Sequence, residues 1–526
     1  MKLCAALAFA ALLATAAAAA AQTPTGSDEE GEGEGAATPT PSPSPNAVVY
    51  HGYVRSFYFT RQNASNNPGA RFDYAAGATY NSDAVNQATW NTGLSLDADY
   101  RFGGLPWSIG ATYFYANPMN GPCVVAANHA KGGVCVTQVP PNTNADDTLP
   151  GFTLSTFDEA YLAYKAYGYS GALGYQLFKS PWANPSDSRL KPTAFAGGDL
   201  IYSGLAHWTF EAADMLAFEN RTSSDFSRQT LLTSYPAGGR GLPPNINAPG
   251  GQGISTNGFA FAKAAYANGS PGFSADGYFY GIGDLVNIWW FDGKYTFKDV
   301  RGAPFVALQG GFESNSGRSY LGKIVSQDAG VQIGADVTKN LRLTAGYDAI
   351  PWRTDTILLP PNVTCGSNFQ ITAKGATLAY LLPLNAGQCS TSGAGGPTRI
   401  YYGGWASPYT DSYATDPFFT TSVTQGMADR RAPGTSWKVG VTYAPGDKRF
   451  VFAATDAWYD YGNALAPQRT NIWTLDGRYY LSAVGQGRYR GFLLRYRYAQ
   501  RTQSNTQLLG GSPLFKYNRA QLEYDF

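Results

Sequence analysis

The sequence ends in Lys516-Tyr-Asn-Arg-Ala-Gln-Leu-Glu-Tyr-Asp-Phe526, a stretch in which apolar and polar residues alternate. The two alternating sets are Ala520, Leu522, Tyr524 and Phe526 against Arg519, Gln521, Glu523 and Asp525. Successive side chains of a strand point to opposite faces, so this stretch predicts one strand with an apolar and a charged side. In a soluble antiparallel sheet the apolar side would meet a core, whereas in an outer-membrane barrel it would meet lipid.

The composition favours the barrel. Charged residues make up 14% of the 526 residues, against roughly 25% in an average soluble domain. The chain is instead rich in Gly (61) and Tyr (36). Such a mixture suits strands, tight turns and aromatic girdles rather than helices.

The N-terminal residues predict export. Residues 1–21 form a secretory signal peptide, in which Lys2 precedes an apolar run and Ala16–Ala21 places cleavage after Ala21. A transmembrane anchor is the alternative, but the segment is Ala-rich and small residues precede a polar stretch. Cys4 lies ahead of the apolar run, too early for a lipoprotein cysteine. No later run of 18 apolar residues predicts a membrane helix.

Residues 22–46 predict a disordered periplasmic tail. The acidic Ser27–Gly35 and the Pro-rich Thr38–Pro45 contain nothing that could build a core. The tail is either a solvated spacer or a binding segment. Residues 1–46 contain one basic and five acidic residues, so the remainder has 37 basic and 32 acidic residues, a net charge of +5. That excess weakly favours anions inside a barrel.

Residues 47–526 predict an all-β transmembrane antiparallel barrel of 16 to 18 strands, with 18 favoured. The expected strands are Val48–Arg61, Asn91–Phe102, Trp107–Ala116, Glu159–Tyr169, Ala172–Phe178, Thr193–Ser203, His207–Glu219, Phe259–Ala267, Phe273–Tyr280, Asn287–Phe297, Phe305–Phe312, Ser326–Val337, Leu341–Ala349, Trp437–Tyr443, Phe450–Tyr461, Asn471–Leu481, Tyr489–Gln500 and Lys516–Phe526. A secreted sandwich or propeller is the alternative, but aromatic residues near the ends of apolar strand faces fit membrane interfaces better.

Connections of two lengths alternate between these strands. The short turns are Gly103-Gly104, Ser170-Gly171, Gly204, Asn268-Gly269, Lys298–Ala303, Thr338–Asn340, Pro445–Asp447 and Gly485–Gly487. The long loops are Asn117–Ser155, Asn220–Thr256, Pro351–Thr435 and Ala464–Thr470. Short periplasmic turns and long extracellular loops are the arrangement of outer-membrane barrels.

Four cysteines remain after signal cleavage, and each pair lies in one predicted long loop. They are Cys123 with Cys135, and Cys365 with Cys389. Because the export route is oxidising, two local disulfides are expected. A metal site is the alternative, but His51, His129 and His207 are scattered and form no His-Cys cluster. We therefore expect neither a metal nor a cofactor.

No catalytic constellation is expected. The sequence has no Gly-x-Ser-x-Gly elbow, no phosphate-binding Gly-rich loop and no His-Glu-x-x-His. A barrel phospholipase would need a Ser/His pair, and His207 beside Trp208 is the one candidate singled out. A lone His on a strand fits a girdle or lumen position equally well.

Three stretches together resemble the OprD family of outer-membrane porins. They are Gly52-Tyr-Val-Arg-Ser-Phe-Tyr-Phe-Thr-Arg61, Leu94-Ser-Leu-Asp-Ala-Asp-Tyr100, and Gly174-Tyr-Gln-Leu-Phe178 followed by Asn184-Pro-Ser-Asp-Ser-Arg-Leu-Lys-Pro-Thr-Ala-Phe-Ala-Gly197. Tyr278–Asp284 is a weaker match. The terminal Phe526 is also similar to the signal that the barrel-assembly machinery reads. Two departures are Ala196, where the family commonly has Arg, and the long Pro351–Thr435 segment.

The resemblance implies a barrel of 18 strands whose lumen is narrowed by an inward loop. That loop would be Phe178–Leu190, with Asp187 and Arg189 near the eyelet. A ladder of basic residues would guide carboxylate-bearing solutes such as amino acids or small organic acids.

The residues themselves predict a basic track on one wall. Arg478, Arg495, Arg497 and Arg519 fall on the charged faces of the last three strands. Adjacent strands lie about 4.8 Å apart, so these guanidiniums can line one path for an anion. Alternatively, they form salt bridges with Asp476, Glu523 and Asp525 that stiffen the wall.

We therefore expect a passive porin, biased toward anionic nutrients, in a bacterial outer membrane. Its expected partners are small solutes, outer-membrane lipid or lipopolysaccharide and, through Phe526, the assembly machinery, with no nucleic acid. The chain is expected to be a monomer or a trimer. The alternatives are a barrel enzyme of the phospholipase or protease type and a structural or adhesive surface barrel.

Overall fold

A computed structural model provides the fold for most of the chain that follows residue 47. It describes residues 48–63, 87–119, 153–185, 190–221, 223–233, 253–268, 272–319, 324–358, 371–373, 376–378, 397–410, 415–424, 426–430, 433–461, 469–481, 491–503 and 514–526. The predicted signal peptide and tail lie outside these residues. Among them, no helix is long and apolar enough to cross a membrane.

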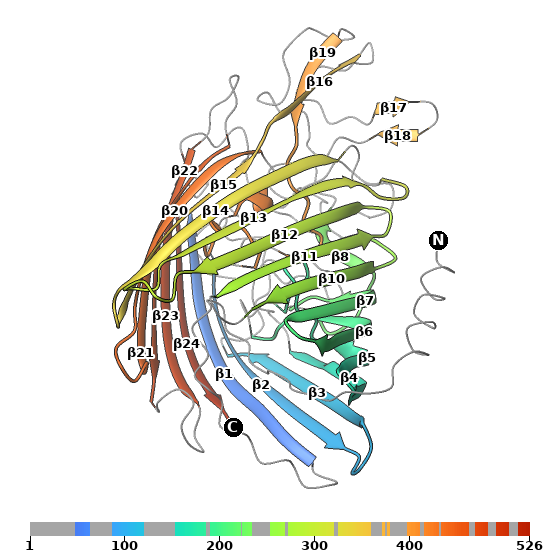
Figure 1. The fold of residues 1–526 in the computed structure, drawn as a ribbon, viewed down its shortest axis with the longest axis vertical. Coiled ribbons are helices and arrows are strands. Elements are labelled where there is room, and N and C mark those ends of the chain that lie inside the picture. The colour runs from blue at the N-terminus through green and yellow to red at the C-terminus, as the bar shows by residue number, and fades with distance from the viewer. Residues whose placement is uncertain are drawn as a thin grey trace.

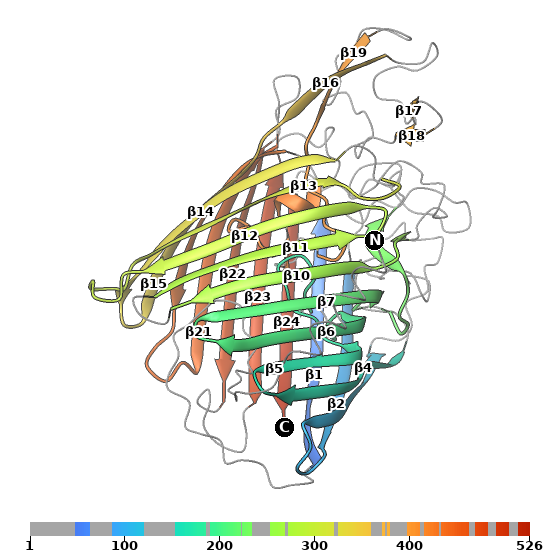
Figure 2. The same ribbon diagram turned by 45° about the vertical axis from the view of Figure 1, so that its right-hand side comes forward.

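Eighteen antiparallel strands form one closed sheet (Figures 1 and 2). They are β1 (Val48–Asn63), β2 (Gln87–Arg101), β3 (Trp107–Pro118), β4 (Leu154–Ala166), β5 (Tyr169–Gln176), β6 (Ala194–Leu205), β7 (Trp208–Glu219), β10 (Phe259–Ala267), β11 (Phe273–Ile282), β12 (Val286–Thr296), β13 (Phe305–Asn315), β14 (Val325–Thr338), β15 (Leu341–Ile350), β20 (Gly434–Tyr443), β21 (Phe450–Asp460), β22 (Arg469–Tyr480), β23 (Phe492–Gln503) and β24 (Leu514–Asp525). Each pairs with its neighbour along the chain, and β24 pairs with β1 to complete the ring. The prediction of an 18-stranded barrel is confirmed.

Short turns gather at the end of the barrel that also holds the C-terminus. The connections at the opposite end are mostly long. Two predicted turns were misplaced: β4 turns into β5 at Tyr167-Gly168 rather than Ser170-Gly171, and β6 continues past Gly204 to Leu205. Tyr167 (φ 55°) adopts a left-handed backbone conformation that favours glycine. A turn placed by its typical residue types was therefore predicted at the wrong position.

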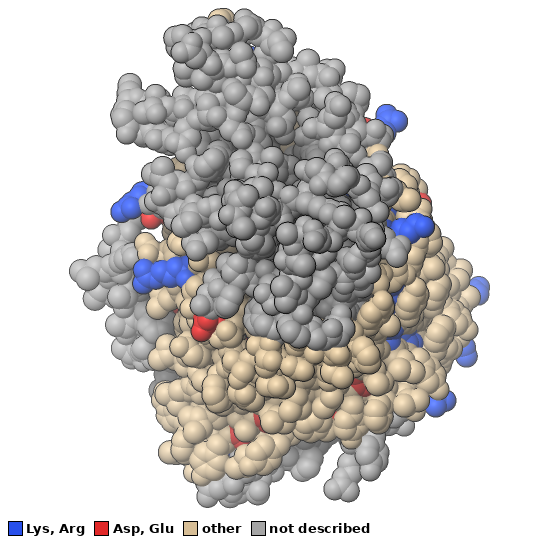
Figure 3. Space-filling view, turned by 180° about the vertical axis from the view of Figure 1, so that it is seen from behind, with Lys and Arg blue, Asp and Glu red and all other residues tan. Residues whose placement is uncertain are grey.

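The alternation predicted for the last strand is present in β24. Leu522 and Phe526 are exposed on the outside, whereas Arg519 and Glu523 are buried on the inside. The same pattern continues around the ring, with large apolar residues exposed outward on most strands. In Figure 3, the described part of the visible surface is mainly uncharged, and only scattered charged side chains interrupt it. This outer surface is suited to lipid.

Smaller elements lie in the loops of the long-loop end. They are the paired strands β8 (Gln229–Thr233) and β9 (Gly253–Ser255), β16 (Arg353–Leu358) and β19 (Pro397–Tyr402), and β17 (Ile371–Ala373) and β18 (Ala376–Leu378), with the short helix α2 (Met427–Arg430). The β16–β19 hairpin projects beyond the barrel at the end opposite the C-terminus (Figures 1 and 2). Other parts of the loops turn into the barrel and contact its inner wall.

Candidate functional site

The four arginines predicted to form a track lie together on the inner wall. Arg478 is on β22, Arg495 and Arg497 are on β23, and Arg519 is on β24. Arg478 faces Arg495 across one strand pair, and Arg497 faces Arg519 across the next. Four guanidiniums are thus grouped within three neighbouring strands.

Two further arginines extend this group, which we call the basic wall. Arg501 lies on β23, and Arg55 lies on β1, next to β24. Arg55 escaped prediction because it shares a strand face with Phe57, which made the apolar face of β1 ambiguous. In the barrel the side chains of Arg55 and Phe57 both point inward. The Arg519 guanidinium lies 4.2 Å from the centre of the Phe57 ring. A cation over an aromatic face is a favourable contact, so the mixed face is physically consistent.

Carboxylates inside the basic wall pair with several of its arginines. Asp476 accepts hydrogen bonds from Nη2 of Arg495 at 2.5 Å and Nη2 of Arg497 at 2.7 Å, and Nη2 of Arg478 lies 3.6 Å away. Arg55 pairs with Glu523. Salt bridges, the alternative reading of these arginines, are thus present at Asp476, and a track for anions stays a prediction. Six arginines against two carboxylates leave a net charge of +4 on the basic wall.

Most of the basic wall is shielded from solvent. Arg519 is 1% exposed and Arg501 is 2% exposed, whereas the Arg478 side chain is 26% exposed. Buried guanidiniums interact more strongly with an anion than exposed ones because less water screens them.

The described ends of the connection between β5 and β6, which we call the crossing loop, contact two different walls of the barrel. Near its start, the backbone N–H of Trp182 donates to the hydroxyl of Tyr280 on β11 at 3.2 Å. Near its end, the carbonyl of Leu190 accepts from the hydroxyl of Tyr53 on β1 at 2.9 Å. The loop thus joins two distant walls. Asp187 and Arg189 lie outside the described residues, so their position at an eyelet stays a prediction.

Lys191 anchors this crossing loop. Its Nζ lies 3.1 Å from Asp158 of β4 and 3.5 Å from Glu219 of β7, and all three side chains are almost fully buried. A β-bulge in the β3–β4 pairing lets Asp158 and Glu159 both reach the interior. Burial alone would lower the pKa of Lys191, but the two carboxylates outweigh burial and raise it. The ammonium group therefore stays charged at neutral pH.

The long loop between β15 and β20 supplies a second inward segment, of which residues 403–410, 415–424 and 426–428 are described. Its hydrogen bonds to the wall involve buried charges: Asp348 of β15 accepts from the hydroxyl of Thr420 at 2.7 Å, and Glu313 of β13 accepts from the N–H of Ala406 at 2.9 Å. Lys438 of β20 donates to the carbonyl of Thr421 at 2.8 Å. These contacts fix the segment to the wall formed by β13, β15 and β20.

Four aromatic rings join the two inward segments. Trp182 of the crossing loop stacks on Trp405 at 5.1 Å, and both contact Trp290 of β12 and Phe418. The three tryptophans are fully buried. A large apolar core therefore occupies this side of the barrel interior.

The two segments also meet the basic wall. Leu190 and Val423 share a buried apolar cluster with Phe57, Phe515 and Tyr517 of the barrel. Phe515 is the register partner of Arg501, and Phe57 lies against Arg519, so the apolar cluster is interleaved with the arginines of the basic wall.

Much of the remaining wall is acidic. Inward carboxylates include Asp97 and Asp99 on β2, Glu159 on β4, Asp199 on β6 and Glu211 on β7. Thr112 donates to Glu159 at 2.7 Å and Tyr161 donates to Asp99 at 2.8 Å, so these groups are held in place. The lumen therefore has walls of opposite charge.

Other predicted features lie away from the lumen or outside the described residues. Cys123, Cys135, Cys365 and Cys389 are all outside the described residues, so the two disulfides stay predictions. His207 lies in the turn between β6 and β7, where its Nδ1 is 3.1 Å from the carbonyl oxygen of Ala267. Within the described ranges, no three His, Cys, Asp or Glu side chains are grouped to hold a metal ion.

Several solved structures have a similar architecture. OccK9 (OpdG) of Pseudomonas aeruginosa superposes with a TM-score of 0.59 over 91% of this chain and 98% of its own, at 15% identity. OccK2 (OpdF) in complex with glucuronate and OpdK with vanillate, both from the same organism, match with the same TM-score and coverage at 12% identity. The chain has the fold of the OprD-family porins. No family model and no curated protein matches it at the sequence level.

This OprD-like fold is that of an outer-membrane barrel, as the alternation of β24 predicted. The likeness spans nearly all of the neighbours' chains. At such low identity the likeness concerns the fold. Any preference for a solute depends on the side chains that line this lumen.

Proposed function

We propose that the protein is a porin for passive diffusion of small solutes, with a preference for anions that carry a carboxylate. The carrying observation is the basic wall, where six arginines and two carboxylates leave an excess of positive charge beside the apolar cluster. An anion that enters can exchange part of its hydration for the donors of the partly exposed Arg478, and the buried arginines add positive potential behind it.

The paired carboxylates support passage rather than tight binding. Asp476 holds Arg495 and Arg497 in fixed orientations, so little side-chain ordering is needed when a solute arrives. It also lowers the local positive potential, which lets the anion leave again, as conduction requires. Two solved neighbours are complexes with glucuronate and vanillate, both carboxylates.

Planar lipid bilayers test the proposal. Purified protein should form discrete channels whose reversal potential under a KCl gradient indicates anion preference. Replacing Arg495 and Arg497 together by Ala should shift that potential toward cations. Arg449→Ala, which removes an exposed turn arginine paired with Asp447, is the matched control and should leave it unchanged.

Two results would count against the proposal. Folded protein that forms no discrete channels would overturn the porin function and favour a structural or adhesive barrel. Channels whose reversal potential is the same with and without Arg495 and Arg497 would overturn the role of the basic wall. Swelling of protein-containing liposomes should also be faster in glucuronate than in glucose, which differs from it mainly by lacking the carboxylate.

A further inference from the structure

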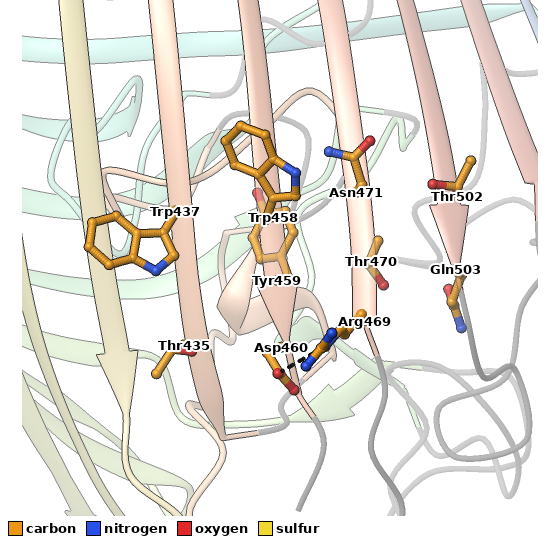
Figure 4. A pocket seen from close by; sticks show the side chains of 10 residues that line it. All are labelled: Thr435, Trp437, Trp458, Tyr459, Asp460, Arg469, Thr470, Asn471, Thr502 and Gln503. Atoms are coloured by element: carbon orange, nitrogen blue, oxygen red, sulfur yellow. Dashed lines mark ion pairs between the residues drawn. The ribbon is translucent and has the colours of Figure 1, made fainter.

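The outer face of the barrel has a polar pocket at the long-loop end of β20, β21 and β22 (Figure 4). It has a volume of about 530 Å³. The residues nearest the loops are register partners across the three strands: Thr435 with Asp460, and Asp460 with Arg469. Arg469 Nε lies 3.4 Å from Asp460, and the Arg469 side chain is 80% exposed. This guanidinium is therefore accessible beside its carboxylate partner.

A row of amphipathic side chains lies one step farther from the loops. Trp437 and Trp458 are register partners, 57% and 43% exposed, and Asn471 is the next partner along. Tryptophan at such a position presents an apolar ring and one N–H donor, which is why it is frequent at membrane interfaces. Figure 4 shows both indoles beside the polar groups of the pocket.

The following row contains a carboxylate on the outward face. Asp456 lies two residues before Trp458 on the same outward face of β21. Its side chain accepts a hydrogen bond from the Asn471 amide at 2.6 Å. A carboxylate surrounded only by lipid tails is costly, and at this level of the wall the Asn471 amide, which also lines the pocket, is its polar partner.

A mainly apolar hollow of about 890 Å³ lies on the outer face two residues farther along β20, β21 and β22, and extends over β13, β14 and β15. Val439, Ala454 and Leu475 line it next to the Asp456 row, and Phe297 forms part of its far side. Small side chains such as Ala454 and Ala345 lie between larger ones, which makes the wall concave. Along the strands from the loops toward the turns, the outer face is therefore first ionic, then aromatic, and then mainly apolar, although Asp456 and Thr474 also line the hollow.

We propose that this composite groove binds one phosphorylated glycolipid of the outer leaflet. The sugar headgroup would occupy the pocket and an acyl chain the hollow. The Asp460 carboxylate, the Asn471 amide and threonine hydroxyls beside two indoles match a ring bearing many hydroxyls, and Arg469 matches a phosphate on it. A phospholipid headgroup has too few hydroxyls to use these acceptors. A second copy of the chain would have to insert a ridge into the hollow.

Native mass spectrometry of the detergent-solubilised protein tests the proposal, with deep-rough lipopolysaccharide and phosphatidylethanolamine as the two probes. We expect one lipopolysaccharide to bind per chain, in clear preference to phosphatidylethanolamine. Trp458→Leu combined with Arg469→Gln should weaken lipopolysaccharide binding by about tenfold or more. Trp289→Leu, at another outward and partly exposed position on β12, is the matched control and should bind as wild type does.

A second variant tests the hollow separately. Ala454→Trp fills it without removing a polar group and should also weaken lipopolysaccharide binding by about tenfold. Equal affinity for phosphatidylethanolamine, or equal losses in Trp289→Leu, would overturn the proposal in favour of a general lipid annulus. A dimer that Ala454→Trp dissociates, with no lipopolysaccharide bound, would overturn it in favour of a contact between two copies.

Discussion

Gly52 and Phe526 exchange two backbone hydrogen bonds, of 3.2 Å and 2.9 Å, and thereby close the seam between the first and last strands. The contact is tight. A Cβ atom added to Gly52 would lie 2.7 Å from the Phe526 ring and 2.4 Å from the carbonyl oxygen of Ser95 on β2. Only glycine fits between the two neighbouring strands at this point. The final residue of the chain therefore belongs to the barrel's closure as well as to its outer face.

Replacing Gly52 by Leu should impair this closure. The added side chain forces the seam apart, and overpacking of this kind costs about 1–3 kcal/mol. We expect a lower midpoint in urea unfolding from lipid vesicles and less folded, heat-modifiable protein on gels. Gly446→Leu is the control, because a Cβ there meets nothing within 4 Å. Equal effects of both substitutions would contradict the role of the seam.

Most of the barrel could be predicted because its information is local and periodic. Every second residue of a strand such as β24 faces lipid, so apolar character repeats along the sequence and reports the fold. Turns are less well determined, since a residue such as Tyr167 can adopt the conformation expected of glycine. The inward paths of the loops follow from contacts between distant residues, such as Trp182 with Trp405, which leave no periodic trace.

Asp476→Asn should make the channel more anion-selective. The substitution removes the carboxylate shared by Arg478, Arg495 and Arg497 and raises the net charge of the basic wall by one. We expect the reversal potential in a salt gradient to move further toward that of chloride, opposite to the effect of removing Arg495 and Arg497. A shift toward potassium would contradict the assignment of this wall to the solute path.

Asp456→Asn is the matched control for Asp476→Asn. Asp456 lies on the neighbouring strand β21 but on the outer face, so it should not affect selectivity. Both variants must first run as folded barrels on gels, because an unpaired buried guanidinium can destabilise the wall.

The basic wall was only partly predictable. Arg495 and Arg497 alternate with apolar residues, so their face could be assigned from sequence. Arg55 could not, because its face also carries Phe57, whose partner is the Arg519 guanidinium of another strand. Lys191 gave no signal either, since its two carboxylate partners lie on β4 and β7 and are brought together only by the closed sheet.

Lys191→Met should release the crossing loop. The change leaves Asp158 and Glu219 buried without their cation, and breaking a buried pair in this way costs about 3–5 kcal/mol. We expect single-channel recordings with more frequent current fluctuations and a larger mean conductance. Adding Asp158→Asn to Lys191→Met removes one uncompensated charge and should restore part of the stability. No rescue in this double variant would contradict the ion-pair explanation.

The same anchor predicts a dependence on alkaline pH. The pKa of Lys191 is raised above its ordinary value of 10.5, because the two carboxylates outweigh its burial. While its carboxylate partners are ionised, charged Lys191 stabilises the loop in full below its unfolded-state pKa of about 10.4, and this stabilisation is lost as pH rises through the folded-state value. Wild-type conductance should be steady near neutral pH and become noisy only in strongly alkaline solution. The conductance of Lys191→Met should be noisy both near neutral pH and in strongly alkaline solution, with no such transition.

Trp405→Ala should widen the lumen by loosening the second inward segment. Trp405 is fully buried against Trp182 and Trp290, and removing a large buried aromatic side chain costs about 3–5 kcal/mol. The surrounding barrel strands hold their own hydrogen bonds, so the loss should fall on the segment rather than on the ring. We expect a larger conductance and faster uptake of bulky solutes, with heat-modifiable migration unchanged. Trp437→Ala, on the outer face, is the matched control and should leave conductance as it is. If Trp405→Ala conducts like the wild type, the segment does not limit the path.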